Sequence, residues 1–114
     1  MKFINLNLFG GRGVSSGLYT KYSYNNLPKN SHDLINNGWK DITDPRNTSG
    51  SKDFYNPKTK DRLRFDKGQK GKPGYKGKDH YHWHNPNSKN DKDFYLDKNG
   101  KPVPKNHKKS HLLP

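Results

Sequence analysis

The sequence contains no cysteine and no glutamate, and each absence removes a class of chemistry. A chain without cysteine forms no disulfide, presents no thiolate nucleophile and cannot build a cysteine-type zinc site. All ten acidic residues are aspartate, so any carboxylate chemistry must rely on aspartate.

Long apolar segments are also missing. Only 25% of the 114 residues are hydrophobic, and no stretch approaches the roughly 20 apolar residues of a membrane span. Asn5 and Asn7 interrupt the apolar start, which argues against a signal peptide. A chain of this length can form at most one small domain. We therefore expect the seven Tyr, five Phe and two Trp to supply most of the packing.

Positive charge is in large excess, with a formal net charge of +13. Residues 51–114 hold most of it, with 17 Lys or Arg against seven Asp. Such a field attracts polyanions and accelerates their association. The charge therefore favours a nucleic acid or an acidic protein as the partner. The alternative is that the charge only keeps the protein soluble.

Two segments have the pattern of β-hairpins. In residues 51–66, Leu63 and Phe65 alternate with charged residues after a turn sequence. In residues 93–103, Asn99-Gly100 lies between two short apolar runs, which is a strong hairpin signal.

One short helix is predicted before these hairpins. Ser31 can serve as its N-cap and Gly38 as its stop, with Trp39 and Ile42 as core candidates after it. We expect an α+β fold that is mostly β, with this helix packed on a small, twisted antiparallel sheet of about four strands.

The chain divides into two parts on this interpretation. Residues 1–27 are expected to form a flexible N-terminal arm, because glycines interrupt them, and residues 28–114 a compact domain. The opening sequence NLNLFGGRG resembles the start of head-associated proteins in phages of Gram-positive bacteria. That resemblance implies an association with a phage-like particle.

Residues 67–78, KGQKGKPGYKGK, form what we call the basic loop. We expect it to be exposed and to bind the phosphate backbone of a nucleic acid, with Tyr75 available to stack on a base. The alternative is a solvated connection. The phosphate-binding candidates are Lys70, Lys72, Lys76 and Lys78.

The segment Asp79-His-Tyr-His-Trp-His84 carries the densest chemistry. On a strand, His80, His82 and His84 share one face, and Tyr81 and Trp83 share the other. We expect the aromatic face to pack in the core, although its rings could instead stack on bases. Two cations, Arg62 and Arg64, are expected on a neighbouring strand that faces the same way as the histidines.

Three roles compete for these histidines. The first is general acid–base catalysis, in which one imidazole takes a proton from a ribose 2′-OH and another protonates the leaving 5′-oxygen. Asp79 would orient an imidazole and a cation such as Arg64 would stabilise the transition state. The second is a metal site made by His80, His82 and His84 with Asp79 or Asp66. The third is a set of exposed histidines without a chemical role.

A second histidine segment lies near the C-terminus. Ser110-His111 can fold back to the same groove, and a serine beside a histidine is a minimal hint of nucleophilic catalysis. We therefore count His111 among the catalytic candidates.

The C-terminal half of the sequence resembles a known family of proteins. The run RLRFDKGQKGKPGYKGKDHYHWHNPNS, followed by FYLDKNGKPVPKN and SH, resembles the C-terminal nuclease toxin domains of bacterial polymorphic toxin systems. Its layout is also similar to that of the rRNA-cleaving cytotoxic domain of colicins. The resemblance covers roughly residues 38–114. It implies a compact ribonuclease that is delivered into competing cells and is neutralised by an immunity protein.

The resemblance also implies site residues. Asp79 and His82 match the catalytic Asp and His of the colicin pattern, with His80 or His84 as the alternative. That pattern has a downstream Glu, which this chain lacks, so Asp91 or Asp93 would have to replace it. It also has a basic residue near the end, for which Lys105, Lys108 and Lys109 are the candidates.

The function predicted from the sequence is a metal-independent ribonuclease toxin, without a cofactor, that cleaves tRNA or rRNA in the target-cell cytoplasm. An acidic immunity protein is the expected protein partner, because complementary charge accelerates association. The alternatives are a metal-dependent DNase that uses the histidines as ligands, and a nonenzymatic nucleic-acid-binding or packaging protein of a phage-like particle.

Overall fold

The computed structural model describes Tyr24 and residues 26–114. The predicted arm lies almost entirely outside the described residues, and so does the phage-like opening sequence. Tyr24 and Leu27, at the end of that arm, are buried in the core. Tyr24 stacks on Trp83 at a ring-centroid distance of 4.1 Å, and its hydroxyl donates a hydrogen bond to Asp61.

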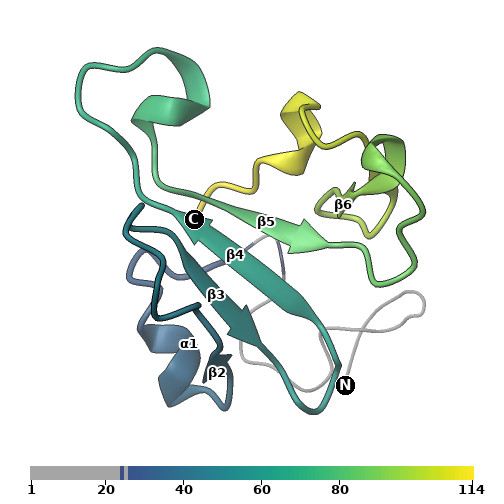
Figure 1. The fold of residues 1–114 in the computed structure, drawn as a ribbon, viewed down its shortest axis with the longest axis horizontal. Helices are drawn as coiled ribbons and strands as arrows, with labels where there is room; N and C mark the ends of the chain where they lie inside the picture. The colour runs from purple at the N-terminus through teal and green to yellow at the C-terminus, as the bar shows by residue number, and fades with distance from the viewer. Residues whose placement is uncertain (1–23, 25) are drawn as a thin grey trace.

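The fold is one six-stranded antiparallel sheet in which every strand pairs with its neighbour in sequence (Figure 1). The expectation of a mostly β, antiparallel fold is therefore confirmed, and the described residues form six strands in place of about four. The strands are β2 (Lys40–Asp41), β3 (Lys52–Tyr55), β4 (Arg62–Asp66), β5 (His80–His84), β6 (Tyr95–Leu96) and β7 (Pro102–Val103).

Both predicted hairpins are present. Strands β3 and β4 pair with Phe54 opposite Leu63. In their connection, the side chain of Asn56 accepts hydrogen bonds from the backbone N–H groups of Lys58 and Thr59. Strands β6 and β7 are joined by a turn in which Gly100 has a φ of 83°. The sequence signals of both turns were therefore sufficient to place the hairpins.

The predicted helix is shorter than expected and begins differently. It is α1 (Asp33–Asn36), and His32 occupies the cap position without a side-chain hydrogen bond, so the expected cap by Ser31 is wrong. Gly38 follows with a φ of 95°, in agreement with its predicted role as the stop.

One of the two core candidates after the helix is also wrong. Trp39 is 2% exposed, whereas Ile42 is 44% exposed. The two residues are three positions apart along an extended segment, so alternation places their side chains on opposite faces. Both residues of the edge strand β2 are exposed, so of the segment from Trp39 to Ile42 only Trp39 reaches the core.

The core lies on one face of the sheet. It is built largely from aromatic rings, as the composition predicted, and includes Phe54, Leu63, Phe65, Tyr81 and Trp83. Tyr81 is fully buried and its hydroxyl donates to the carbonyl of Pro28 at 2.7 Å. The expectation that the Tyr81 and Trp83 face packs inward is therefore confirmed.

The C-terminal tail adds to the sheet beside β5, as Figure 1 shows. Tyr81 and Leu112 form an antiparallel bridge with two backbone hydrogen bonds of 2.8 Å. Among the described residues, the 3-10 helices η2 (Gly74–Gly77) and η3 (Asp91–Asp93) lie in connections between strands, and η4 (Lys108–Ser110) lies in the C-terminal tail. Within the described residues, no helix has the length and apolarity needed to cross a membrane.

Candidate functional site

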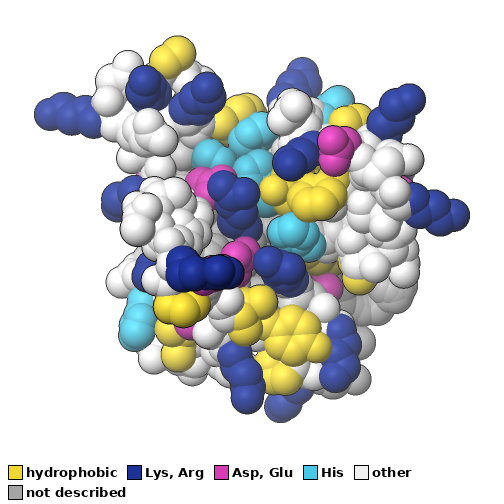
Figure 2. Space-filling model, viewed as in Figure 1, with side chains coloured by type: hydrophobic (Ala, Val, Ile, Leu, Met, Phe, Trp, Pro, Cys, Tyr) yellow, Lys and Arg dark blue, Asp and Glu magenta, His cyan; other side chains and the backbone are white. Residues whose placement is uncertain are grey.

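The polar face of the sheet gathers the chemistry that the sequence predicted. Leu63 and Phe65 of β4 face the core, so Arg62, Arg64 and Asp66 project to the opposite face. The same alternation in β5 places the three histidines there. The register sets Arg64 opposite His82 and Asp66 opposite His80. Figure 2 shows histidine, acidic and basic side chains together on this face.

The carboxylate of Asp66 lies at the centre of this group. One of its oxygens is 3.4 Å from Nε2 of His80 and 3.4 Å from Nε2 of His82. The other oxygen accepts a hydrogen bond of 2.8 Å from Nε of Arg64. Burial alone would raise the pKa of Asp66, but hydrogen bonds from both histidines and the charge of Arg64 outweigh it and lower the pKa below its usual value. Asp66 is therefore a carboxylate at all ordinary pH values.

His80 has an acceptor on each side of its ring. Nδ1 lies 2.8 Å from the carbonyl oxygen of Lys78, and Nε2 faces Asp66. Burial opposes the charged form, but the hydrogen bonds to Asp66 and to the backbone prevail and raise the pKa of His80. The ring is thus held in an environment that favours the imidazolium, which is the state of a proton donor.

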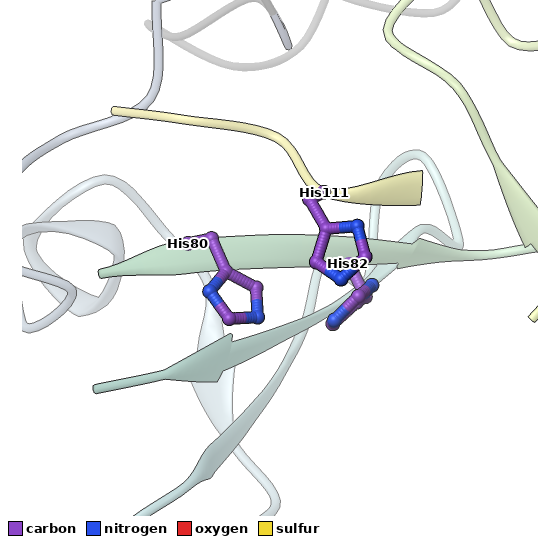
Figure 3. A group of neighbouring side chains, drawn as sticks. All are labelled: His80, His82 and His111. Carbon is purple, nitrogen blue, oxygen red and sulfur yellow. The ribbon is translucent and has the colours of Figure 1, made fainter. Parts of the chain in front are cut away.

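His111 comes from the C-terminal tail and completes the cluster (Figure 3). Because Leu112 faces the core beside Tyr81, its neighbour His111 projects to the polar face. Its ring centroid is 5.0 Å from that of His80 and 4.8 Å from that of His82. Tyr75 of the basic loop stacks on the other side of the ring, with centroids 4.3 Å apart and planes 9° apart.

The environment of His111 favours its neutral form. Burial lowers the pKa of His111, and the neighbouring His82 and His80 lower it further. Nδ1 lies 3.2 Å from the carbonyl oxygen of Lys108 and 3.4 Å from Oγ of Ser110. In the tautomer with its proton on Nδ1, that carbonyl accepts the hydrogen bond and the lone pair is on Nε2. A neutral imidazole with a free lone pair is the state of a general base.

His82 is the third imidazole of the cluster, with its ring about as far from His80 as from His111. Its ring stacks on Tyr95 at 4.4 Å and meets that of His80 edge-on at 4.9 Å. Its Nδ1 is buried and has no hydrogen-bond partner in the described part of the chain. The fold therefore holds His82 by ring packing and by the single contact of Nε2 with Asp66.

These three rings could also hold a metal ion. The ligating nitrogens of His80, His82 and His111 lie within 4.8 Å of one another. Three nitrogen ligands and an open position suit a catalytic zinc ion. The set differs from the His80, His82 and His84 set that strand alternation predicted, because the tail brings the ring of His111 beside those of His80 and His82.

His84 lies instead in a neighbouring pocket. The pocket has a volume of about 310 Å³ and is lined by Asp53, Arg62, Arg64, His84, Phe94, Tyr95 and Lys105, together with Asn47, Ser49 and Ser51. Burial, reinforced by the charge of Arg62, lowers the pKa of His84 to about 4. His84 is therefore neutral at pH 7 and is set apart from the acid–base cluster.

Asp79, the carboxylate that the sequence placed beside the histidines, holds the basic loop closed. Its Oδ1 accepts a hydrogen bond of 2.7 Å from the backbone N–H of Gly68, and its Oδ2 lies 3.7 Å from Nζ of Lys67. Asp66 is the carboxylate that contacts the imidazoles. The sequence contains one indication of this contact. Asp66 continues the two-residue spacing of Arg62 and Arg64, so strand alternation places these three side chains on one face of β4.

The basic loop has a defined shape. Backbone hydrogen bonds join Gln69 to Lys76 and Lys72 to Gln69. The chain segments approach so closely that a Cβ on Gly77 would lie 2.2 Å from the carbonyl oxygen of Lys72. The four phosphate-binding candidates, Lys70, Lys72, Lys76 and Lys78, are all exposed on this frame.

The remaining candidates lie elsewhere or serve local structure. Ser110 is fully buried, which argues against a nucleophilic role. Asp93 forms a capping box with Asn90 at the start of η3. Asp91 is exposed, and its backbone carbonyl accepts a hydrogen bond from Lys105. Lys108 and Lys109 are exposed on η4, next to His111.

No protein-family model, curated protein or solved structure matches this chain. The geometry of the cluster and the resemblance of the sequence are therefore the grounds for a function.

Proposed function

We propose that this chain is a metal-independent endoribonuclease of the toxin type. One observation carries the proposal. Two imidazoles whose ring centroids are 5.0 Å apart have environments that move their pKa values in opposite directions. A pair of titratable groups with opposed shifts, beside a fixed cation, is the arrangement that general acid–base cleavage of RNA requires.

In the proposed reaction His111 acts as the base. Its Nε2 takes the proton of a ribose 2′-OH, and the 2′-oxygen attacks the adjacent phosphorus. The bond from phosphorus to the 5′-oxygen of the next nucleotide breaks, and His80 gives its proton to that leaving oxygen. The products are a 2′,3′-cyclic phosphate and a free 5′-hydroxyl. Asp66 keeps His80 protonated before the reaction, and Arg64 stabilises the charge that develops on the phosphate oxygens.

The basic loop would supply substrate binding. Four exposed lysines lie on this loop, and Tyr75 joins the loop to His111 by ring stacking. Contacts to phosphates position a nucleic acid without reading its sequence. This division of labour predicts that loop substitutions change RNA affinity and that histidine substitutions change the rate.

The test is incubation of the purified chain with total RNA in the presence of EDTA. We expect cleavage to continue, and fragments to end in 2′,3′-cyclic phosphate. Replacing the ribose by 2′-deoxyribose at the cleaved position should block the reaction. His111→Ala and His80→Ala should each lower the rate by about 10²–10⁴-fold, while circular dichroism and RNA affinity stay unchanged. His32→Ala removes an exposed histidine at the start of α1, outside the cluster, and serves as the control.

The second candidate is a metal-dependent nuclease, which the three convergent nitrogen ligands favour. It predicts that EDTA abolishes cleavage, that Zn²⁺ restores it, and that plasmid DNA is also cut. Absence of cleavage of any substrate, together with steeply salt-dependent binding, would instead indicate a packaging protein.

The toxin character of the proposal rests on the sequence resemblance and on the charge of +13. It predicts that expression of the chain in a bacterial cytoplasm arrests growth by cleavage of tRNA or rRNA. It also predicts rescue by an acidic immunity protein, since opposite charge accelerates association. Detection of the chain in purified phage-like particles would identify the delivery route.

A further inference from the structure

The pocket around His84 is separate from the histidine cluster but shares residues with it. Arg64 lines the pocket and also donates to Asp66, and Tyr95 lines it while stacking on His82 at 4.4 Å. A ligand that extends from the cluster along the polar face therefore meets this pocket next. Apart from Arg64, no residue that lines the pocket takes part in the proposed acid–base chemistry.

The charge of the pocket suits a phosphate. Three cations, Arg62, Arg64 and Lys105, line it against the single carboxylate of Asp53. Arg64 is held by Asp66, and Arg62 lies 3.6 Å from Asp53, so neither cation is free of an acidic partner. Lys105 lies over the ring of Phe94 at 5.1 Å and its side chain is exposed. The excess of positive charge is therefore greatest on the Lys105 side.

The same wall presents aromatic surface. Phe94 is partly exposed, and its ring meets that of His84 edge-on at 5.1 Å. His84 is neutral at pH 7 because burial lowers its pKa to about 4. Aromatic rings beside a cationic edge are the features with which proteins bind single nucleotides of unpaired strands.

The size of the pocket selects among nucleic acids. A volume of about 310 Å³ lies at the lower end of the range for small-molecule sites. It can accept one base that is turned out of its strand but not a base pair. Double-stranded RNA is recognised across its grooves by shape, and such recognition does not use a pocket of this kind.

We propose that this pocket binds one nucleotide of a single-stranded RNA next to the cleaved phosphate, with a phosphate near Lys105 and Arg62 and the base against Phe94. The inference rests on the proposed ribonuclease function and adds its substrate class. The substrate is an unpaired segment, such as a loop of a structured RNA.

The first experiment measures cleavage of a short single-stranded oligoribonucleotide and of the same strand annealed to its complement. We expect the duplex to be cut at least tenfold more slowly. Lys105→Ala and Phe94→Leu should each raise KM for the single strand about tenfold, the effect of losing one charge-assisted or stacking contact, with kcat nearly unchanged. Lys98→Ala removes an equal charge from the exposed turn between β6 and β7 and should leave KM unaltered.

The second experiment does not depend on cleavage. Titration of the wild-type chain with adenosine 5′-monophosphate should shift the NMR resonances of the Phe94 and His84 rings, and Phe94→Leu should weaken that binding. Inorganic phosphate alone should bind without moving the Phe94 ring.

The outcomes separate the two proposals. Cleavage of RNA with unchanged KM in both variants, or equal cleavage of the duplex, would overturn the nucleotide pocket and leave the ribonuclease standing. Failure to cleave any RNA would overturn the ribonuclease, and the titration would then decide the pocket. If adenosine 5′-monophosphate moves neither ring, the pocket binds no nucleotide.

Discussion

The ring of Tyr75 lies parallel to that of His111, with centroids 4.3 Å apart and planes 9° apart. Tyr75 belongs to the basic loop before β5, and His111 to the C-terminal tail. This contact is therefore the link between the segment that is expected to bind RNA and the imidazole that is expected to take the first proton. It also covers one face of His111 and restricts the orientation of its ring.

The first prediction follows from this stacking. Tyr75→Ala should lower kcat for RNA cleavage by about 10- to 100-fold, because displacing the general base His111 by about 1 Å slows the reaction on that scale. Tyr75→Phe keeps the ring and should retain nearly full kcat. If Tyr75 served mainly to stack on an RNA base, Tyr75→Ala would raise KM and leave kcat unchanged. Steady-state kinetics of the three proteins distinguish the two roles.

The second prediction concerns the carboxylate between the histidines. The folded-state pKa of His80 is raised above its usual 6.5, so the stability it contributes is present below pH 6.5 and is lost as the pH rises through the folded value. The folded-state pKa of Asp66 is lowered from 3.8, so its contribution is present above pH 3.8 and is lost as the pH falls through the folded value. The two contributions overlap between about pH 4 and 6.5.

Asp66→Asn should therefore destabilise the protein most in that window, by about 2 kcal/mol. The difference from wild type should shrink toward pH 9 and again below pH 3. Urea denaturation followed by tryptophan fluorescence across this pH range measures it. A difference that does not vary with pH would contradict the Asp66–His80 ion pair. The same variant should lose activity at pH values where wild-type His80 is still protonated.

The third prediction concerns His84, whose titration lowers the stability of the folded protein instead of raising it. The folded-state pKa of His84 is lowered to about 4, so the unfolded chain binds a proton at this residue more readily than the folded one does. His84 therefore costs stability as the pH falls from 6.5 to 4. His84→Gln should reduce the loss of stability over this range, by at most ~1.4 kcal/mol per pH unit, the slope for one proton. An unchanged acid slope in this variant would show that His84 titrates normally.

The fourth prediction tests the shape of the basic loop. Gly77→Ala would place a Cβ 2.2 Å from the carbonyl oxygen of Lys72, so the backbone of the loop must open. We expect weaker RNA binding and faster tryptic cleavage after Lys70, with the sheet intact. Gln69→Ala, on the same loop, adds no such clash and is the control. Equal protease resistance of Gly77→Ala and wild type would show that the loop is not held closed at Gly77.

Much of the fold was accessible from the sequence because short-range chemistry dictates it. The turn residues near Asn56 and at Asn99-Gly100 specify both hairpins. Alternation of Leu63 and Phe65 with charged residues predicts which face of β4 is buried. The helix was harder to predict. It has only four residues, and a helix this short depends on tertiary contacts for its ends.

The sequence by itself determined that His80, His82 and His84 share one face of a strand, because side chains alternate with a period of two. It also determined the positive charge and the absence of any glutamate or cysteine from the site. These properties depend only on neighbouring residues and on composition, so no knowledge of distant contacts is needed to read them.

Only the tertiary structure decided which groups complete the site. The register of β4 against β5 sets Asp66 beside His80, whereas Asp79 turns to the basic loop. The bridge between Tyr81 and Leu112 brings His111 into the cluster from 31 positions beyond His80 in the chain. Strand register and the path of the tail are set by long-range packing of Tyr81 and its neighbours. For this reason the alternation within one strand could not reveal them.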